Sequence, residues 1–256
     1  LDCENGGNTM SDRLIASIHD CITTLARDNE CRAIVISSLG KDFCSGVNLD
    51  DLGQFNTDLA SVEDISRRGR VIEDRITHIQ RAFTAIEMCP KPVIAIIHGA
   101  CAGPGMGLAT ACDMRYCSTD TWFQVKEVEI GMAADVGTLQ RLPKIIGSQS
   151  LVRELCFTGR KLESEEAFKS GLVNRVFGTK EEMLKFAFET ATKIASLSPV
   201  AVQNTKKSII YSFDRPAQEG LDHIREINLL ALQSEDFISA ATAAATKGEV
   251  AEFSKL

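Results

Sequence analysis

Apolar residues recur with the period of an α-helix in two segments of the N-terminal half of the chain. The first stripe follows Ser11, a plausible N-cap, and carries Leu14, Ile15, Ile18, Ile22 and Leu25. The second spans residues 61–88 and is otherwise charged. Its apolar residues, which we expect to face a core, are Ile65, Val71, Ile72, Ile76, Ile79 and Phe83. Pro90 and Pro92 end that segment. We therefore predict one helix in each segment.

Short apolar runs between polar boundaries predict strands. Residues 33–38 and 93–97 are rich in β-branched side chains and suit buried strands. Shorter runs predict strands at 114–117, 122–125 and 172–177. After the strand at 93–97, a glycine-rich turn leads into a helix that runs to about Cys112, and a later helix is predicted at 138–146.

From about residue 180 the pattern is helical. We predict helices at 180–197, 200–212, 217–232 and 235–247. Strands alternate with helices early in the chain and helices dominate late, so the fold class is α/β with a C-terminal helical region. We expect a core domain at 1–195 and a helical oligomerisation region at 196–256.

Composition excludes several classes of function. The formal net charge of −7 supplies no basic surface for nucleic acid. No apolar run reaches the roughly 18 residues that span a bilayer. The nine cysteines are odd in number and scattered, which favours buried free thiols over a disulfide framework. No Cys, His and Asp spacing indicates a metal site.

The two ends of the chain suggest where the protein works. The last residues, Ser254, Lys255 and Leu256, form a tripeptide that the peroxisomal import receptor reads as an address. The chain opens on Leu1 rather than Met, so we expect upstream residues, with possible mitochondrial targeting among them. The sequence thus predicts a peroxisomal location.

Two loops rich in small residues each follow a predicted strand. They cover residues 43–49 and 103–107. Small residues let backbone N–H groups approach a ligand, and a helix N-terminus adds a field that favours negative charge. Brought together, two such loops would form an oxyanion hole.

The residues around these loops resemble the crotonase (enoyl-CoA hydratase/isomerase) superfamily. The matching segments are 42–49, 91–95, 98–101, 111–115, 123–128, 134–143, 157–160 and 171–173, so the resemblance covers nearly the whole chain. Residues 125–127 and 134–137 look most like the dienoyl-CoA isomerase subgroup. The resemblance implies a fold of repeated ββα units and a homo-oligomer, a homotrimer or homohexamer.

The resemblance also assigns roles to single residues. It implies that backbone N–H groups at Val47 and position 104 stabilise a thioester enolate, while up to three carboxylates, at positions 107, 127 and 135, move protons. Here those three positions hold Gly107, Glu127 and Asp135. By the same resemblance, the coenzyme A thioester is expected along Ser45, Gly46, Asn48, Leu49, Gly103 and Gly107. Coenzyme A is then part of the substrate, and no metal or redox cofactor is expected.

Two departures from the family pattern bear on activity. Pro104 has no N–H to donate, and removing one oxyanion donor from an enzyme lowers its rate by about 10²–10³-fold. Gly105 is therefore the candidate second donor. Gly107 lacks the carboxylate that hydration needs, so the pattern favours conversion of 3,5-dienoyl-CoA to 2,4-dienoyl-CoA, with Glu127 and Asp135 as the proton shuttle.

Alternatives remain open at this stage. One is a Δ3,Δ2-enoyl-CoA isomerase that uses Glu127 alone, and another is a catalytically weak acyl-CoA-binding homologue. Glu127 and Asp135 could instead cap loops or pair with Arg141. Lys206 and Lys207 could contact coenzyme A phosphates or simply lie on a solvated helix face.

Overall fold

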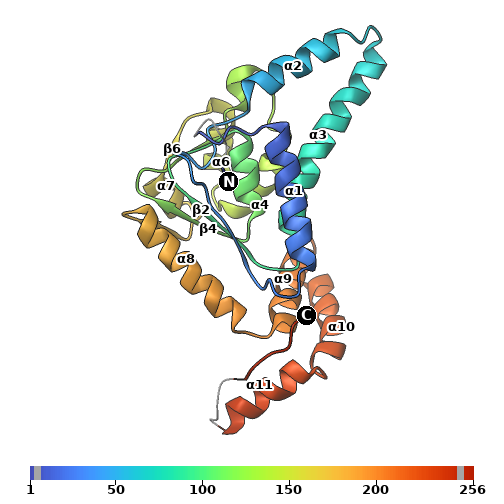
Figure 1. Ribbon diagram of the computed structural model, residues 1–256, viewed down its shortest axis with the longest axis vertical. Helices are drawn as coiled ribbons and strands as arrows, with labels where there is room; N and C mark the ends of the chain where they lie inside the picture. Colours follow the sequence, from blue (N-terminus) through green and yellow to red (C-terminus); the bar gives the residue numbers. More distant parts are fainter. Residues whose placement is uncertain (3–6, 247–250) are drawn as a thin grey trace.

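The computed structural model describes residues 1–2, 7–246 and 251–256 of the chain. Figure 1 shows a central α/β body with a helical hairpin projecting from one end and further helices at the other. The elements in chain order are α1 (Asp12–Arg27), β1 (Ile34–Ile36), α2 (Leu49–Ala60), α3 (Ile65–Met88), β2 (Val93–Ile97), β3 (Ala100–Ala102), α4 (Pro104–Ala111), β4 (Met114–Ser118), β5 (Trp122–Gln124), the 3₁₀ helix η1 (Glu127–Ile130), α5 (Thr138–Ile145), α6 (Gln149–Thr158), β6 (Leu162–Glu163), α7 (Ser164–Lys169), β7 (Arg175–Phe177), α8 (Lys180–Ala195), α9 (Pro199–Ser212), α10 (Ala217–Ala231) and α11 (Glu235–Thr246).

Two small sheets form the centre of the body. The first has the order β1-β2-β4-β7 and all its neighbours are parallel. The second has the order β3-β5-β6, with β3 and β5 parallel and β5 and β6 antiparallel. The predicted α/β class with a C-terminal helical region is confirmed.

The central strand β2 is apolar at every position because both of its faces are covered. Val93, Ala95 and Ile97 belong to the main hydrophobic cluster, whereas Ile94 and Ile96 point to a second cluster. That second cluster includes Met183 and Ala187 of α8, which lies against the first sheet. A strand buried on both faces shows no polar alternation, as the sequence indicated.

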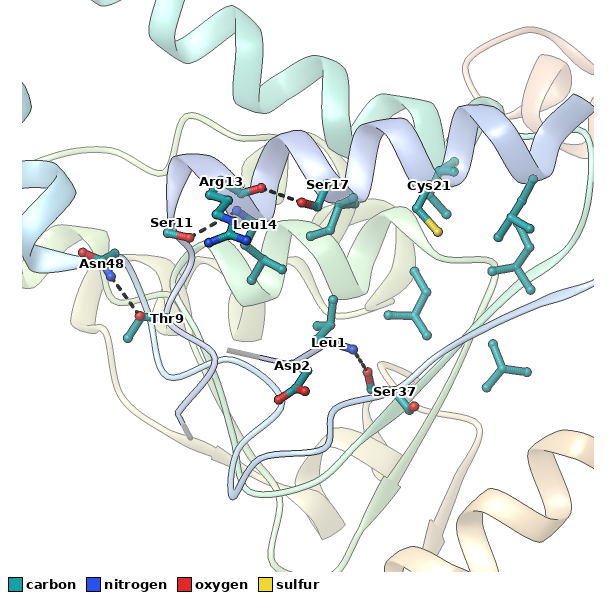
Figure 2. A pocket seen from close by; sticks show the side chains of 16 residues that line it. Leu1, Asp2, Thr9, Ser11, Arg13, Leu14, Ser17, Cys21, Ser37 and Asn48 are labelled. Atoms are coloured by element: carbon teal, nitrogen blue, oxygen red, sulfur yellow. Dashed lines mark hydrogen bonds between the residues drawn. The ribbon is translucent and has the colours of Figure 1, made fainter. Parts of the chain in front are cut away.

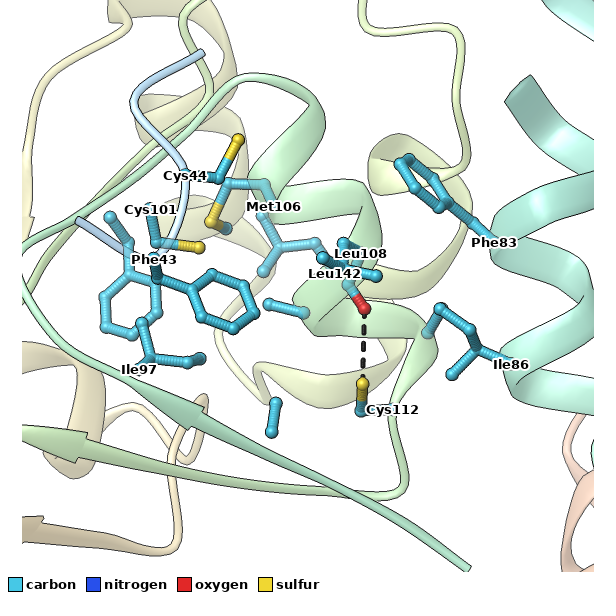
Figure 3. Close-up of a cluster of buried hydrophobic side chains, with 14 of the residues drawn as sticks. Phe43, Cys44, Phe83, Ile86, Ile97, Cys101, Met106, Leu108, Cys112 and Leu142 are labelled. Atoms are coloured by element: carbon cyan, nitrogen blue, oxygen red, sulfur yellow. Dashed lines mark hydrogen bonds between the residues drawn. The ribbon is translucent and has the colours of Figure 1, made fainter. Parts of the chain in front are cut away.

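The helix α4 lies inside the main cluster, which explains its unusual composition. All seven of its residues from Gly105 to Ala111 are buried. Figure 3 shows Met106 and Leu108 of this helix among Phe43, Phe83 and Leu142, which come from three other segments. Small residues allow neighbouring segments to approach the helix axis closely.

Three segments lie side by side and carry the loops of interest. Cys44 pairs with Cys101 as in a parallel sheet, through Cys44 N–H to Ala100 O and Ala102 N–H to Cys44 O, both 2.9 Å. On its other side, β3 pairs with β5 from Ala100–Trp122 to Ala102–Gln124. The residues that follow Cys44, Ala102 and Gln124 therefore leave the sheet at one common edge.

Several elements differ from the sequence-based expectation. The sequence analysis did not predict α2, β3, α6, β6 or α7. The strand expected at 172–177 covers only Arg175–Phe177, and Leu172 and Val173 are buried just before it. The elements β3, β6 and α7 are too short to carry a periodic signal, and β3 directly continues the apolar run of β2. Helix α2 is longer, at 12 residues, but none of its residues is buried, so it presents no stripe to the core.

The apolar stripe of α3 faces the core only in its last turns. Ala82, Phe83 and Ile86 are buried, but Ile65 is 81% exposed, and Val71 and Ile72 also face solvent. Figure 1 shows the reason, since α2 and the first half of α3 extend beyond the body. The expectation that Ile65, Val71 and Ile72 point into the core was wrong.

Helix α9 is fastened to the body by a buried lysine. Lys206 Nζ donates to Ile86 O (3.4 Å) and Lys91 O (3.0 Å), and forms an ion pair with Asp113 (2.6 Å). Asp113 in turn accepts the Val93 N–H at 2.7 Å. A solvated helix face was therefore the wrong interpretation for Lys206, while its neighbour Lys207 is exposed.

The remaining compositional expectations concern thiols, membranes and metals. All eight described cysteines are free and six of them are buried, while Cys3 lies outside the described residues. Across the described part of the chain, no helix combines the length and hydropathy that a membrane span requires. Within the same residues, no three His, Cys, Asp or Glu side chains are grouped to hold a metal ion.

Candidate active site

The two loops of small residues meet the carboxylate of Glu127. Gly103 has φ 54° and ψ −121°, a conformation that is strained for any residue with a side chain. A Cβ placed on Gly103 would lie 3.7 Å from Glu127 Oε1 and 3.9 Å from Gly46 Cα. The first loop, the second loop and one candidate acid therefore converge on one point.

Each loop has one backbone N–H that makes no hydrogen bond to any described residue of the protein. Met10 pairs with one side of the first loop, through Met10 N–H to Gly46 O (2.8 Å) and Asn48 N–H to Met10 O (3.1 Å). The intervening Val47 N–H makes no hydrogen bond to a described residue. It is thus available to an external acceptor.

The second available donor is at Gly105. Pro104 occupies the first position of α4, where the absence of an N–H suits the helix. The next N–H, at Gly105, makes no hydrogen bond to a described residue, as expected in the first turn of a helix. Gly105 also packs directly on the first loop, because a Cβ there would lie 2.8 Å from Cys44 Cβ.

Glu127 is a buried carboxylate with an unpaired oxygen. It begins η1 and is 7% exposed, and its Oε2 has no hydrogen-bond partner among the described residues. Burial raises the pKa of Glu127, the charge of Asp135 raises it further, and the backbone N–H groups of residues 126 and 127 partly counter this. A carboxylate with a raised pKa is a stronger base, which suits a proton acceptor.

Asp135 lies in the loop between η1 and α5 and is only partly buried. Burial raises the pKa of this carboxyl too. Gln80 of α3 fixes the loop by donating from Nε2 to Asp135 O at 2.7 Å. Because the charge of Asp135 raises the pKa of Glu127, the two carboxyls lie within electrostatic reach of each other.

Arg141 neutralises neither of these acids. Its guanidinium pairs with Glu87 (2.7 Å) and also contacts Thr84 Oγ1 (3.3 Å) on α3. The alternative in which Glu127 or Asp135 is one half of an ion pair with Arg141 finds no support in these contacts.

The third family position, Gly107, faces a closed apolar wall. A Cβ there would lie 2.9 Å from Phe83 Cε2 and 3.0 Å from Val136 Cγ2. Phe83 is fully buried, so it cannot swing away into solvent. The space in which a carboxylate at position 107 would lie is occupied by a phenyl ring and a methyl group.

The other predicted ligand-lining residues of the first loop have structural tasks. Asn48 caps α2, since its Oδ1 accepts from Asp50 N and Asp51 N at 3.0 Å each, and its Nδ2 donates to Thr9 Oγ1. Leu49 opens α2 and is 74% exposed. Ser45 N–H donates to Gly7 O at 3.0 Å. Contact of these three residues with coenzyme A stays a prediction.

A separate cavity lies between α1 and β1. Its volume is about 720 Å³, and its wall includes Ser11, Arg13, Cys21, Ser37 and Asn48. Figure 2 shows these residues around the opening beside Leu1. Neither Glu127 nor Asp135 lines it. This cavity is therefore distinct from the place where Glu127 meets the two loops of small residues.

Two residues that shape the site are not identified as functional by the sequence analysis. Phe83 is expected there only as a core residue, and Gln124 only as part of a matching segment. Gln124 has a polar side chain that is 8% exposed, at the end of the strand leading to Glu127. A glutamine in an otherwise apolar strand is the signal that could have identified it.

Comparisons with known proteins identify the family and the relatives of this chain. The profile of the family described as Enoyl-CoA hydratase/isomerase matches residues 2–247. The chain is 47% identical over 260 aligned residues to the mitochondrial Delta(3,5)-Delta(2,4)-dienoyl-CoA isomerase of Pongo abelii, covering 100% of this chain and 78% of the relative. It is 40% identical to the peroxisomal Delta(3,5)-Delta(2,4)-dienoyl-CoA isomerase of Arabidopsis thaliana, covering 92% of this chain and 84% of the relative.

A solved structure supports the fold. The crystal structure of an enoyl-CoA hydratase from Bacillus anthracis superposes with a TM-score of 0.85 at 25% identity, covering 98% of this chain and 92% of that chain. The fold expected from the sequence resemblance is confirmed.

Proposed function

This chain belongs to the enoyl-CoA hydratase/isomerase family, and from that membership we propose that it isomerises 3,5-dienoyl-CoA thioesters to 2,4-dienoyl-CoA thioesters. One observation carries the proposal. The unpaired, buried carboxylate of Glu127 lies where two loops of small residues meet, and a second carboxyl, Asp135, is close enough to perturb it.

The proposed reaction moves one proton and two double bonds. The N–H groups of Val47 and Gly105 hydrogen-bond the thioester oxygen, which gains negative charge when a proton leaves C2. One carboxylate removes that C2 proton, and the electron pair shifts along the conjugated chain. The other carboxyl returns a proton to C6, which yields the 2,4-diene. The steps need no resident metal or redox cofactor, and coenzyme A enters as part of the substrate.

Burial gives the two acids suitable properties for this exchange. A carboxyl whose pKa is raised accepts a proton from a weak carbon acid more readily and can still release it later. The apolar wall of Phe83 and Val136 leaves no third carboxylate beside them. By the family resemblance, hydration holds its water between carboxylates at positions 107 and 127. The wall occupies the space of the first of these, so it favours isomerisation over water addition.

Matched amide variants test the proposal. Glu127→Gln should lower kcat on a 3,5-dienoyl-CoA by about 10²–10⁴-fold, because it removes a proton-transfer group without changing shape. Asp135→Asn should lower diene turnover by a similar factor. Both variants are assayed on 3,5-dienoyl-CoA and 3-enoyl-CoA by absorbance, with Gln149→Ala, a surface change on α6, as the control.

The same measurements separate the alternatives. A Δ3,Δ2-enoyl-CoA isomerase would turn over only the 3-enoyl substrate and would be indifferent to Asp135→Asn. A catalytically weak acyl-CoA-binding homologue would bind the thioester tightly and show the same residual rate with and without Glu127→Gln. Lack of diene turnover by the unmodified protein would refute the proposal.

Self-association is part of the proposal, with a second copy of this chain as the partner. The C-terminal helices α9, α10 and α11 expose many large apolar side chains, among them Ile209, Phe213, Leu221, Leu229, Leu230, Leu232, Phe237 and Ile238. A concentration of this kind is typical of an interface rather than of a free surface. The resemblance to the family implies a homotrimer or homohexamer, and either one closes with point-group symmetry.

A peroxisomal location completes the proposal. It is supported by the location in the name of the Arabidopsis relative. The name of the Pongo relative gives mitochondria, which is the alternative.

A further inference from the structure

The side chain of Gln124 connects η1 to the turn that follows α6. Its Nε2 donates to Gly159 O at 2.6 Å and to Glu129 Oε1 at 2.9 Å. Its backbone O accepts the Gly103 N–H at 3.0 Å. One buried residue therefore contacts the second oxyanion loop, the helix that begins with Glu127, and the turn that follows α6.

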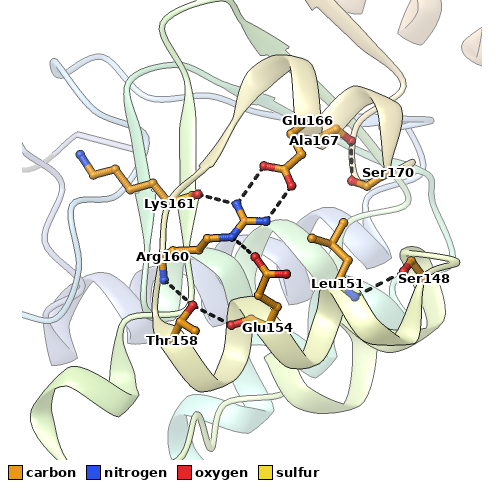
Figure 4. Close-up of polar contacts among 9 residues, drawn as sticks. All are labelled: Ser148, Leu151, Glu154, Thr158, Arg160, Lys161, Glu166, Ala167 and Ser170. Atoms are coloured by element: carbon orange, nitrogen blue, oxygen red, sulfur yellow. Dashed lines mark hydrogen bonds and ion pairs between the residues drawn. The ribbon is translucent and has the colours of Figure 1, made fainter.

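The acceptor at Gly159 is held rigidly. Figure 4 shows the neighbouring Arg160 between two acids: its Nε pairs with Glu154 (2.6 Å), and its two terminal nitrogens pair with both oxygens of Glu166 (2.9 and 2.7 Å). Arg160 also donates to Lys161 O at 3.0 Å. These contacts fasten the 158–161 turn to α6 and α7, so Gln124 bonds to a fixed point.

The same turn packs against η1. Gly159 has φ 64°, and a Cβ there would lie 3.3 Å from both Glu129 Cγ and Val128 Cγ2. The turn therefore limits how far η1 can move toward α6. Gln124 adds a directional bond to this contact through Glu129.

Helix η1 needs such support because it is weak by itself. It is a single four-residue 3₁₀ turn, and its N-cap residue, Lys126, forms no side-chain cap hydrogen bond. Glu127 Oε2 has no partner among the described residues, so the carboxylate contributes little to its own placement. The position of Glu127 relative to Gly103 must come from the residues around η1.

We propose that Gln124 is a positioning residue that holds Glu127 against the oxyanion loops by tying Glu129 to the Gly159 turn. The inference rests on the proposed function, because it assumes that Glu127 transfers the proton. Gln124 acts through Glu129 and the backbone and does not itself touch the reacting atoms.

The first test removes the amide. Gln124→Ala should lower kcat on 3,5-dienoyl-CoA by about 10- to 100-fold, because a shift of about 1 Å at a catalytic group has effects of this size. KM should change by less than about threefold. The matched control is Gln149→Ala, which also removes an amide that donates to a backbone carbonyl, that of Pro143, but on the surface.

The second test uses Glu129, which is exposed, so that folding is preserved. Glu129→Gln keeps an oxygen that accepts from Gln124, whereas Glu129→Ala removes it. We expect Glu129→Gln to retain nearly the full kcat and Glu129→Ala to lose part of it. Equal kcat values for these two variants would overturn the inference, even if Gln124→Ala were too unstable to assay.

The third readout is the acidic limb of the pH profile of kcat/KM, which reports the pKa of the catalytic base in the free enzyme. The titratable groups facing Glu127 are Asp135 from the loop before α5 and Cys156 from α6, and neither is changed in Gln124→Ala. Releasing η1 admits water to Glu127, so its raised pKa should fall and the limb should move to lower pH. A residue that only stabilised the fold would leave this limb in place.

These outcomes distinguish the inference from the function on which it rests. If Glu127→Gln retains full diene turnover, the proposed function fails. If Glu127→Gln is inactive while Gln124→Ala keeps both its kcat and its acidic limb, the function stands and the positioning role of Gln124 is wrong.

Discussion

At the scale of single residues, the site places a charge where the fold would favour a neutral group. Glu127 is buried, and its Oε2 lacks a hydrogen-bond partner among the described residues. Burial and the nearby Asp135 raise its pKa in the folded state above that in the unfolded chain. Folding therefore favours the protonated form, and ionisation of Glu127 at neutral pH opposes folding.

This linkage predicts a pH-dependent gain in stability on removing the charge. Below the pKa that Glu127 has in the unfolded chain, the carboxyl is protonated in both states and the stability that protonation provides is fully present. That stability is lost as the pH rises through the raised pKa of the folded state, where Glu127 ionises. Glu127→Gln should therefore be more stable than the unmodified protein at pH 7, and the difference should shrink toward pH 4. Urea unfolding at both pH values measures it, and a destabilised Glu127→Gln at pH 7 would contradict the assignment.

The sequence could predict the identities of these acids but not their surroundings. Glu127 and Asp135 lie in segments that match the family pattern, and the roles proposed for them rest on that resemblance. The phenyl ring of Phe83 beside Gly107 comes from a helix 24 positions earlier in the numbering, and no local pattern reports such a contact. Gln124 likewise acts through Gly159, which only the tertiary fold brings near.

At the scale of elements, the 16-residue helices α1 and α8 were predictable and the shortest helices, η1 and α7, were not. The helix after Ser11 begins as expected, with Ser11 Oγ accepting from Leu14 N at 3.2 Å. Helix α8 begins with a capping box between Thr179 and Glu182. By contrast, η1 and α7 span only four and six residues, too few for a period to emerge.

The attachment of α9 yields a prediction with an internal control. Lys206→Met should lower the free energy of unfolding by about 1–3 kcal/mol, because it leaves the carbonyl groups of Ile86 and Lys91 without their buried donor and Asp113, which water still reaches, without its cation. Lys207→Met, on the exposed neighbour, should change it by less than about 0.5 kcal/mol. Chemical denaturation of both variants measures the difference, and equal effects would show that the contacts of Lys206 add no stability.

At the scale of the whole molecule, the two ends of the body present different surfaces. The α2–α3 hairpin projects from one end, and α9, α10 and α11 gather at the other. The alternation of strands and helices predicted this α/β arrangement. It could not predict that the N-terminal half of α3 would lie beyond the sheets, because an amphipathic stripe looks the same whatever later covers it.

Self-association is expected to depend on the C-terminal end. Leu230 is 79% exposed and Leu229 is 64% exposed on α10. Replacing both with Glu should shift the molecular mass measured by light scattering from an oligomer to a monomer, since burying two carboxylates in an apolar interface is strongly unfavourable. Leu39→Glu, at an equally exposed site away from these helices, should leave the mass unchanged. A double variant that remains oligomeric would place the interface elsewhere.

The packing at Gly107 also constrains how this chain could change over evolutionary time. A descendant that acquired an acid at position 107 would have to place it where Phe83 and Val136 now meet, and the first such mutation would disrupt the core before any new chemistry appeared. A smaller residue at position 83 would have to come first, at the loss of a fully buried aromatic ring. At least two substitutions in a fixed order separate this site from one with three acids, so the gain of an acid at position 107 is disfavoured by epistasis.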